Sequence, residues 1–375
     1  MRLNDMDDMD DMVMDQEERD RLERLRIKRK KRERNVYLLV ILGCIAGMLL
    51  FIVLGMLLYR ITHDGKTDAV AVNGEAVTYT QEELENRIAE AAEAARAEGV
   101  KEVLGDLEEK LSNGDTMVET LRPFYPDDIV VVSSGRFHFI PIKENLKKHN
   151  RLQENLAVLE NGEFQYSDNG QVVSHKGIDV SYHQGEIDWQ QVAGDGVEFA
   201  FIRVGMRGYE TGKLVADEQF ENNITGALAN GIKVGVYFFS QAVTPDEVAE
   251  EAAFVLEQIA PYRVEFPVVF DVEKVAASSA RMNQISVEER TNLAVSFCQS
   301  IAAAGYTPMV YHNMEMGALL LDMEKLDEYE KWFAYYGSEI YYPYDYQIWQ
   351  YSEKGTVAGI NGNVDLNISF KMWGE

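Results

Sequence analysis

The spacing of hydrophobic and polar positions divides this chain into one long apolar run, a helical stretch and a region of short alternating runs. Residues 36–59 read VYLLVILGCIAGMLLFIVLGMLLY, which is 24 residues without a charged side chain. At about 1.5 Å of rise per residue, such a helix spans a hydrocarbon core about 30 Å thick. The run is longer than the apolar core of a cleavable signal peptide and begins only after 35 residues. The pattern therefore predicts a permanent transmembrane helix.

The charges around this run indicate its orientation. Residues 21–34 contain nine basic side chains, and the other flank has far fewer. Basic residues are retained on the cytoplasmic side of a membrane, so we expect residues 1–35 inside the cell as a tail. Residues 60–375 carry 52 acidic and 25 basic side chains, and they account for the whole net charge of −27. This part would repel nucleic acid and anionic lipid. The expected location is the cell membrane, single-pass, with the C-terminal domain outside.

Residues 60–175 have a mixed pattern that predicts an extracellular stalk with a small α+β module. The capping-box pair Thr80 and Glu83 precedes apolar positions at helical spacing, and we expect this helix to be interrupted near Gly99 and Gly105. Its apolar face is expected to pack on the module, with a stalk-mediated dimer as the alternative.

Two hairpins are predicted in the module. One joins residues 129–132 to 137–140, and the other covers 163–173 with Asn169-Gly170 as its turn. A short helix is expected over 143–159. The expected role of the module is to hold the following domain away from the membrane, and wall binding is the lesser alternative.

From residue 176 onward, short apolar runs alternate with amphipathic segments. This alternation indicates a parallel β-sheet with helical crossovers. Eight runs in 200 residues favour a barrel, and no Gly-rich phosphate loop supports an open doubly wound sheet. The helices thin out after Tyr311, so the last strands are expected to lack full helical connections. The fold class is α/β, a modified TIM-like barrel over residues 176–375. The predicted strands are 177–180, 199–204, 233–239, 267–272, 308–311, 332–335, 347–349 and 364–366, and the predicted helices are 217–230, 245–259 and 287–304.

Acidic and aromatic residues stand late in several of these runs. Chemistry in such barrels is built at the C-terminal ends of the strands, so these side chains are expected to converge. They are Asp179, Tyr237, Asp271, Glu273, Tyr311 and Asp365.

The pair Asp271 and Glu273 is the sharpest local signal. Residues two apart on a strand point to the same side, roughly 6.5–7 Å apart along the chain. Apolar residues precede Asp271, and two carboxyls in a low-dielectric setting resist joint ionisation, so one tends to stay protonated at neutral pH. A protonated acid beside a carboxylate is what glycoside cleavage needs. An isolated D-x-E is more often a solvated pair or a cation site.

Four motifs follow one another in this region. They are GIDVSYHQG at 177–185, GVYFF at 235–239, VFDVE at 269–273, and IWQY followed by NVDLN at 348–351 and 363–367. In this order and at these spacings, they resemble glycoside hydrolase family 25, the lysozymes of the N-acetylmuramidase type. The resemblance covers residues 176–373 and does not extend to the region before them.

The resemblance implies a cleft for a peptidoglycan glycan chain, cleavage of the β-1,4 bond from N-acetylmuramic acid to N-acetylglucosamine, and no metal or other cofactor. By motif match, Glu273 is the general acid, Asp271 is its carboxylate partner, Asp179 and Asp365 are further acids of the site, and Tyr237 assists in the pocket. The second step stays open. Asp271 orients the substrate's own 2-acetamido group for attack on the anomeric carbon, or a carboxylate acts directly or activates water. Net retention is expected.

Further candidates for substrate binding have structural alternatives. Tyr311 closes the fifth run, and His183 follows a strand end, where it contacts sugar or serves a turn. Arg203 ends the second run and is expected to pair with Asp179 or another site acid and lower that acid's pKa. Two aromatic residues on one face of a strand stack on sugar rings or fill the barrel; these are Trp349 and Tyr351.

The leading interpretation is a membrane-tethered muramidase that acts on the cell's own wall. A glycan-binding protein without turnover is the second hypothesis, although Glu273 and Asp271 are both present. A zinc-dependent amidase or deacetylase is the third, but the six histidines are scattered without metal-ligand spacing. The tyrosine-rich residues 335–346 are expected to form a packed edge, with a substrate-facing loop as the alternative. Cys298 is expected in the core and is the only cysteine of the exported part, so no disulfide is expected there.

Overall fold

The computed structural model describes residues 81–374 and divides the chain into two compact units, Met1–Ser112 and Asn113–Glu375. The predicted cytoplasmic tail and the apolar run at 36–59 lie outside the described residues. Within residues 81–374, no helix is long and apolar enough to cross a membrane.

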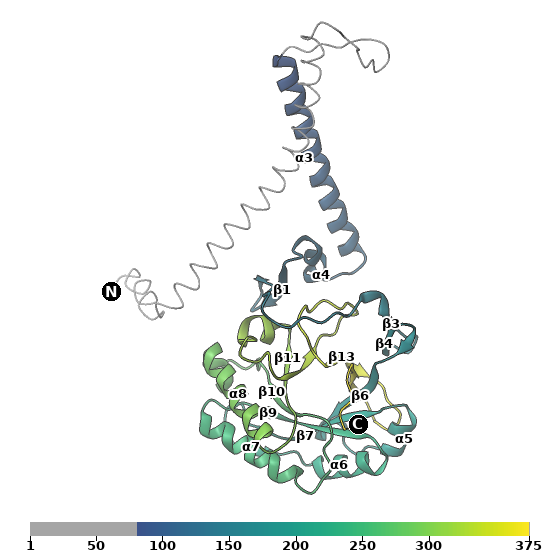
Figure 1. Cartoon of the computed structure of the whole chain (residues 1–375), viewed down its shortest axis with the longest axis vertical. Coiled ribbons are helices and arrows are strands. Elements are labelled where there is room, and N and C mark those ends of the chain that lie inside the picture. The colour runs from purple at the N-terminus through teal and green to yellow at the C-terminus, as the bar shows by residue number, and fades with distance from the viewer. Residues whose placement is uncertain (1–80, 375) are drawn as a thin grey trace, which may run out of the picture. The chain divides into compact units, whose positions relative to one another are not determined.

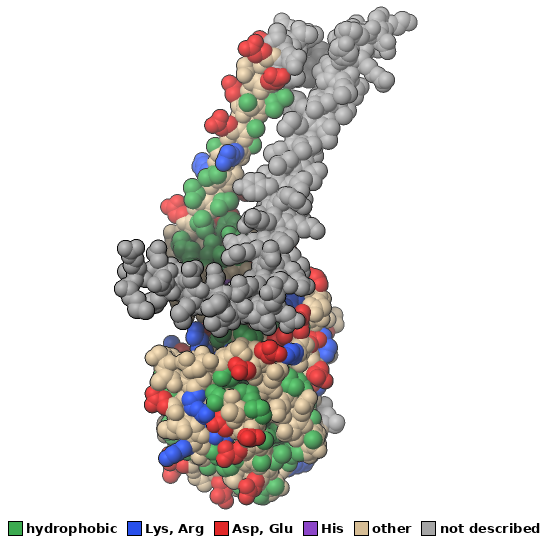
Figure 2. All heavy atoms as spheres, turned by 90° about the vertical axis from the view of Figure 1, so that its left-hand side faces the viewer, with side chains coloured by type: hydrophobic (Ala, Val, Ile, Leu, Met, Phe, Trp, Pro, Cys, Tyr) green, Lys and Arg blue, Asp and Glu red, His purple; other side chains and the backbone are tan. Residues whose placement is uncertain are grey.

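Helix α3, Gln81–Ser112, forms the described part of the first unit. It runs without a break through Gly99 and Gly105, so the predicted interruptions are wrong. A glycine inside a helix costs only about 1 kcal/mol relative to alanine, and the neighbouring Ala, Glu, Lys and Arg residues favour the helix. Val100 and Leu104 are exposed on this helix. Figure 2 shows apolar side chains among charged ones along it. The packing of this apolar face on the module, or on a second copy of the stalk, stays a prediction.

The second unit contains a closed barrel of eight strands (Figure 1). The barrel closes because the first strand pairs with both the second and the last. Every strand predicted after residue 176 is present. In barrel order the strands are β6 His175–Val180, β7 Phe199–Arg207, β9 Lys233–Ser240, β10 Val268–Val272, β11 Pro308–Asn313, β12 Glu330–Ala334, β13 Ile348–Gly355 and β14 Val364–Ser369. A short strand, β8 Leu214–Ala216, adds to the edge of β7.

Helices cover the outside of the first half of the barrel (Figure 1). Three of them match the predicted helices, α6 Phe220–Ala229, α7 Pro245–Ile259 and α8 Val287–Ala303. The short helix α5 Trp189–Gly194 was not predicted. After β11 the chain forms only the single-turn η6 Met316–Leu320, and no α-helix separates the last strands. The predicted loss of helical connections is confirmed.

Strand β14 departs from the predicted parallel arrangement. It is antiparallel to both β13 and β6, whereas the other neighbours around the barrel are parallel. A parallel pair needs a crossover of a dozen residues or more, and only residues 356–363 connect β13 to β14. The short connection therefore allows only a hairpin-like reversal.

Residues 113–175, which we call the N-terminal module, belong to the same compact unit as the barrel. They form α4 Met117–Leu121, η2 Arg122–Phe124, the hairpin β1 Asp128–Ser133 with β2 Arg136–Pro141, and the small sheet of β3 Leu156–Val158, β4 Phe164–Asp168 and β5 Gln171–Val172. Both predicted hairpins are confirmed.

The helix predicted over residues 143–159 is wrong. Only the short η3 Gln153–Asn155 and strand β3 form there. The backbone of this segment bonds elsewhere: the Lys147 carbonyl accepts from the Asp345 amide at 2.9 Å, and Lys148 bridges Tyr344. Tertiary hydrogen bonds override the local helical pattern here.

Large apolar side chains fill the barrel interior at the end where the parallel strands begin. Phe199 and Phe201 stack there on Phe266 and on Trp332, at 4.9 Å and 4.5 Å between ring centroids. A Cβ at Gly235 would lie 2.3 Å from the Phe201 ring, so this position has room only for glycine. The interior is thus a packed apolar core at this end of the barrel and an open polar cleft at the other end.

Candidate active site

A cleft of about 540 Å³ opens among the strand ends of the barrel. Eight of the ten site residues predicted from the sequence line it: Asp179, His183, Arg203, Tyr237, Asp271, Glu273, Tyr311 and Asp365. Seven further residues complete the lining, which are Gln184, Phe239, Trp332, Tyr336, Gln350, Glu353 and Asn363.

Strand alternation and the reversal of β14 bring the acids together. Asp271 lies near the end of β10 and Glu273 directly follows this strand, and both reach the cleft. Asp179 lies near the end of β6. Asp365 lies near the start of the antiparallel β14 and is directly paired with Asp179. Four carboxyl groups from three strands therefore share one cleft.

Asp179 is buried and held by two amide groups. Its Oδ2 accepts from Gln350 Nε2 and from Asn367 Nδ2, both at 2.8 Å. Burial raises the pKa of Asp179, and the two amide donors oppose this by stabilising the carboxylate.

Asp365 lies beside Asp179 but has weaker hydrogen-bond donors. Burial, followed by the charge of Asp179, raises the pKa of Asp365 to about 9. Gln350 Nε2 is 3.5 Å from its Oδ2, which is much longer than the same nitrogen's bond to Asp179. The better donors favour the charge on Asp179 and the proton on Asp365 at neutral pH.

Asp271 and Glu273 form the second carboxyl pair. Burial first, and then the charges of Glu273 and Asp179, raise the pKa of Asp271 well above its ordinary range. Burial also raises the pKa of Glu273, which is more exposed than Asp271. Oδ1 of Asp271 is buried without a hydrogen-bond partner. The pair can thus keep a proton at neutral pH.

Gln350 connects two of the three tyrosines of the cleft with Asp179. Its Oε1 accepts from the hydroxyls of Tyr311 at 2.9 Å and Tyr336 at 3.0 Å, while its Nε2 donates to Asp179. Burial raises the pKa of Tyr311 and of Tyr237 well above the ordinary value, so both stay neutral donors.

The sequence interpretation assigned no role to Gln350 or Asn367. Asn367 donates to Asp179 and accepts from Trp332 Nε1 at 2.8 Å. A signal existed, because both lie within the quoted motifs. Asn367 stands two residues after Asp365 on one strand, which places both on the same face.

Arg203 lines the cleft, but its expected pairing with Asp179 is not present. Its Nε donates instead to Oδ2 of Asp217 at 2.8 Å, and both side chains are buried. The Tyr182 amide donates to the same oxygen at 3.1 Å. Arg203 still acts on the site, since its charge opposes the rise in the pKa of Asp271.

His183 lies at the exposed edge of the cleft, with its ring 4.0 Å from that of Tyr182. The structure leaves it accessible to a bound chain. Its contact with substrate stays a prediction.

Trp349 and Tyr351 do not reach the cleft, so their expected place there is wrong. They are 1% and 4% exposed and pack against Phe164 of the N-terminal module, with the Tyr351 and Phe164 rings stacked at 4.2 Å. Alternation on β13 turns Gln350 inward and its two neighbours outward.

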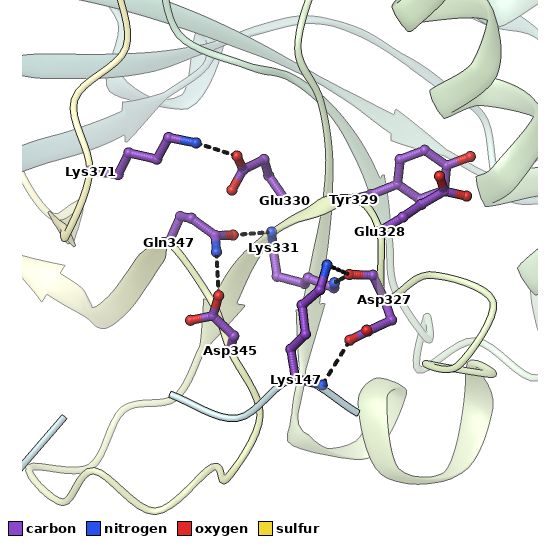
Figure 3. A pocket seen from close by; sticks show the side chains of 9 residues that line it. All are labelled: Lys147, Asp327, Glu328, Tyr329, Glu330, Lys331, Asp345, Gln347 and Lys371. Atoms are coloured by element: carbon purple, nitrogen blue, oxygen red, sulfur yellow. Dashed lines mark hydrogen bonds and ion pairs between the residues drawn. The ribbon is translucent and has the colours of Figure 1, made fainter. Parts of the chain in front are cut away.

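A second cavity, of about 200 Å³, lies where β12 begins and β14 has ended (Figure 3). Charged side chains pair with one another there, as Lys371 does with Glu330, and Lys331 Nζ donates to the Asp327 carbonyl at 2.9 Å. Burial lowers the pKa of Lys331 to about 8. The cavity shares no residue with the cleft and contains none of the predicted site residues.

Comparison with known proteins gives a family. The family model of Glycosyl hydrolases family 25 matches residues 178–360. The chain is 30% identical over 205 residues to the Escherichia coli (strain K12) "Uncharacterized protein YegX", covering 51% of this chain and 68% of that protein. It is 27% identical over 193 residues to the "Autolytic lysozyme" of Clostridium acetobutylicum, covering 51% and 55%.

Among solved structures, the bacterial lysozyme from Streptomyces coelicolor is similar at 24% identity and a TM-score of 0.42, covering 54% of this chain and 93% of that one. The family match includes Asp179, Asp271 and Glu273, and it leaves the N-terminal module outside. The chain belongs to family 25 of the glycosyl hydrolases and is a glycoside hydrolase of the lysozyme type.

Proposed function

We propose that this protein is a muramidase that cleaves the β-1,4 bond between N-acetylmuramic acid and N-acetylglucosamine in peptidoglycan, with Glu273 as the general acid. The observation that carries the proposal is the pair Asp271 and Glu273, whose pKa values burial raises in an open cleft of about 540 Å³. A carboxyl group that keeps its proton at neutral pH can donate it to a leaving glycosidic oxygen.

In the first step, Glu273 gives its proton to the glycosidic oxygen as the bond to the anomeric carbon breaks. Asp271 accepts a hydrogen bond from the N–H of the substrate's 2-acetamido group. The carbonyl oxygen of that group then attacks the anomeric carbon and forms a cyclic oxazolinium ion. Asp271 lines the cleft together with Glu273, which supports this assignment.

In the second step, Glu273 takes a proton from water, which attacks the anomeric carbon and reopens the ring. Two inversions give net retention. The negative charge on Asp179 lies near the reacting centre and would stabilise the positive charge that develops on the sugar. Detection of the β-anomer as the first product by NMR would support this sequence, and the α-anomer would refute it.

The decisive experiment compares the purified full chain with Glu273→Gln on insoluble peptidoglycan. Glu257→Gln is the matched control, because Glu257 is exposed on α7, away from the cleft. Mass spectrometry should find new reducing-end muramic acid from the wild type and the control, and almost none from Glu273→Gln. Binding to sacculi without release of soluble fragments by the wild type would instead favour a glycan-binding protein.

We also propose that residues 36–59 anchor the enzyme in the cell membrane, with the barrel outside and the cell's own wall as its substrate. The uncharged run of 24 residues and the nine basic residues before it support this arrangement. Fractionation should find the full-length chain in membranes, and protease added to intact spheroplasts should remove the barrel. A mature chain free in the medium that lacks the run would contradict it.

A further inference from the structure

The loop between β12 and β13, residues 335–347, carries one wall of the cleft. We call it the tyrosine loop. Apart from one bridge at Tyr344, it has neither helix nor strand of its own, yet Tyr336 lines the cleft with 52% of its side chain exposed. Backbone groups in such a loop need partners from outside it. Many of these partners come from the N-terminal module.

Contacts from the module run along the length of the loop. They join side chains or backbone of the module to backbone groups of the loop at 2.7–3.0 Å, which are ordinary hydrogen-bond lengths. They are Gln153 Oε1 with the Ile340 amide, Gln153 Nε2 with the Ser338 carbonyl, His149 Nε2 with the Tyr342 carbonyl, and the Lys147 carbonyl with the Asp345 amide.

Arg122 holds the end of the loop nearest to the cleft. Its guanidinium carbon lies 3.6 Å from the centroid of the Tyr341 ring, and its Nη1 donates to the Tyr335 hydroxyl at 2.5 Å. The side chain is only 8% exposed. The Tyr341 hydroxyl accepts from the Val130 amide at 2.6 Å and ties the same point to β1. A buried cation over an aromatic face makes a strong, directional anchor.

Hydrogen bonds connect Tyr335, which Arg122 contacts, and its neighbour Tyr336 with the carboxyl groups of the site. The Tyr335 amide donates to the Gln350 carbonyl at 3.0 Å, and the next residue, Tyr336, donates from its hydroxyl to Gln350 Oε1 at 3.0 Å. Gln350 in turn donates to Asp179. Arg122 is therefore three contacts away from a site carboxylate, although it lies outside the family match at 178–360.

The module also touches a second point beside the site. Ser133, at the end of β1, donates to Glu315 Oε1, and Lys274 Nζ contacts the same oxygen at 2.6 Å. Lys274 directly follows Glu273 in the chain. The module thus contacts the chain next to Glu273 as well as the tyrosine loop.

We propose that Arg122 is a positioning residue of the enzyme and that the N-terminal module belongs to the catalytic unit. The module holds the tyrosine loop in place so that Tyr336 borders the bound glycan. This inference rests on the proposed hydrolysis for its kinetic consequence. Its structural consequence, the order of residues 335–347, does not depend on that activity.

The test uses the full chain in detergent with three substitutions. Arg122→Ala removes the anchor, Arg122→Lys keeps the charge without the planar donor, and Tyr335→Phe removes only the accepting hydroxyl. Arg136→Ala is the control, because Arg136 is an exposed arginine of the same module. Amide hydrogen exchange of residues 335–347 and separate kcat and KM values on peptidoglycan fragments are measured for each.

We expect faster exchange of the tyrosine loop in Arg122→Ala, with exchange of β6 to β11 unchanged. KM should rise about tenfold, the loss expected for a hydrogen bond to a charged group, with a smaller change in kcat. Tyr335→Phe should show the same effect in weaker form, and Arg122→Lys should recover part of it.

Two results would overturn the proposal. One is unchanged exchange of the loop in both Arg122→Ala and Tyr335→Phe. The other is faster exchange with unaltered KM, which would make the module a purely structural attachment. Should the wild type not cleave glycan at all, the proposed function fails, and the exchange measurement with retention on sacculi in place of KM still decides the role of Arg122.

Discussion

Replacement of Gln350 by glutamate tests whether the cleft disfavours a further negative charge, as the raised pKa values of its carboxyl groups indicate. Gln350 is 3% exposed, and its amide nitrogen lies 2.8 Å from Asp179 Oδ2. Gln350→Glu keeps the shape and puts an oxygen in place of that nitrogen. The new carboxyl would face Asp179 directly and could remain only in its protonated form, which donates a hydrogen bond to Asp179.

The magnitude follows from proton linkage. A glutamate titrates near pH 4.3 in the unfolded chain, and burial beside Asp179 raises its pKa in the folded state. The folded protein then binds the extra proton more tightly, so stability is fully present below about pH 4.3 and is lost as pH rises towards the folded pKa. The loss is about 1.4 kcal/mol per pH unit. Between pH 4.5 and 7 it amounts to about 3 kcal/mol relative to wild type when the folded pKa lies well above 7.

Urea unfolding of both proteins at several pH values measures this difference. Gln350→Met removes the same donor without adding a carboxyl, so its deficit should change much less with pH. A deficit of Gln350→Glu that stays flat from pH 4.5 to 7 would refute the reasoning, because it would mean that the cleft accepts another ionised group beside Asp179.

Three further outcomes are expected. Trp349→Ala should lower stability by roughly 3–5 kcal/mol in urea unfolding, because the buried indole packs on Phe164; stability equal to that of the wild type would contradict this. Gly235→Ala should cost about 1–3 kcal/mol, because its Cβ would meet the Phe201 ring; an unshifted urea midpoint would count against it. Initial rates should persist at neutral pH and fall as pH rises through the raised pKa of Glu273; loss already near pH 4 would show an unperturbed acid.

Periodicity predicted the barrel well because its strands are short apolar runs bounded by glycine, proline and clear helix caps. Thr244 before Pro245 starts α7, and Ser286 caps α8 through a reciprocal bond with Glu289. These signals are local. The helix expected over residues 143–159 failed for the opposite reason, since its partners lie about 190 residues further along the chain, in the tyrosine loop.

The candidate site was predictable as a set of residue types but not as a set of contacts. Asp271 and Glu273 are local to one strand, so their shared face follows from alternation. The pairing of Arg203 with Asp217 depends on the loop after β7, and no periodicity reports it. To predict which side chains of β13 point into the barrel, one more fact was needed. Ile348 and Gln350 point inward, whereas Trp349 between them points outward.

The reversal of β14 is the part of the architecture that completes the site. A parallel eighth strand would direct its final residues, near Ser369, to the cleft and would leave Asp365 at the opposite end of the barrel. In the antiparallel strand, Asp365 lies opposite Asp179, and Asn367, two residues on, reaches the same carboxylate from within the barrel. The short connection at 356–363 that denies β14 a helical crossover is therefore also what brings the fourth acid to the cleft.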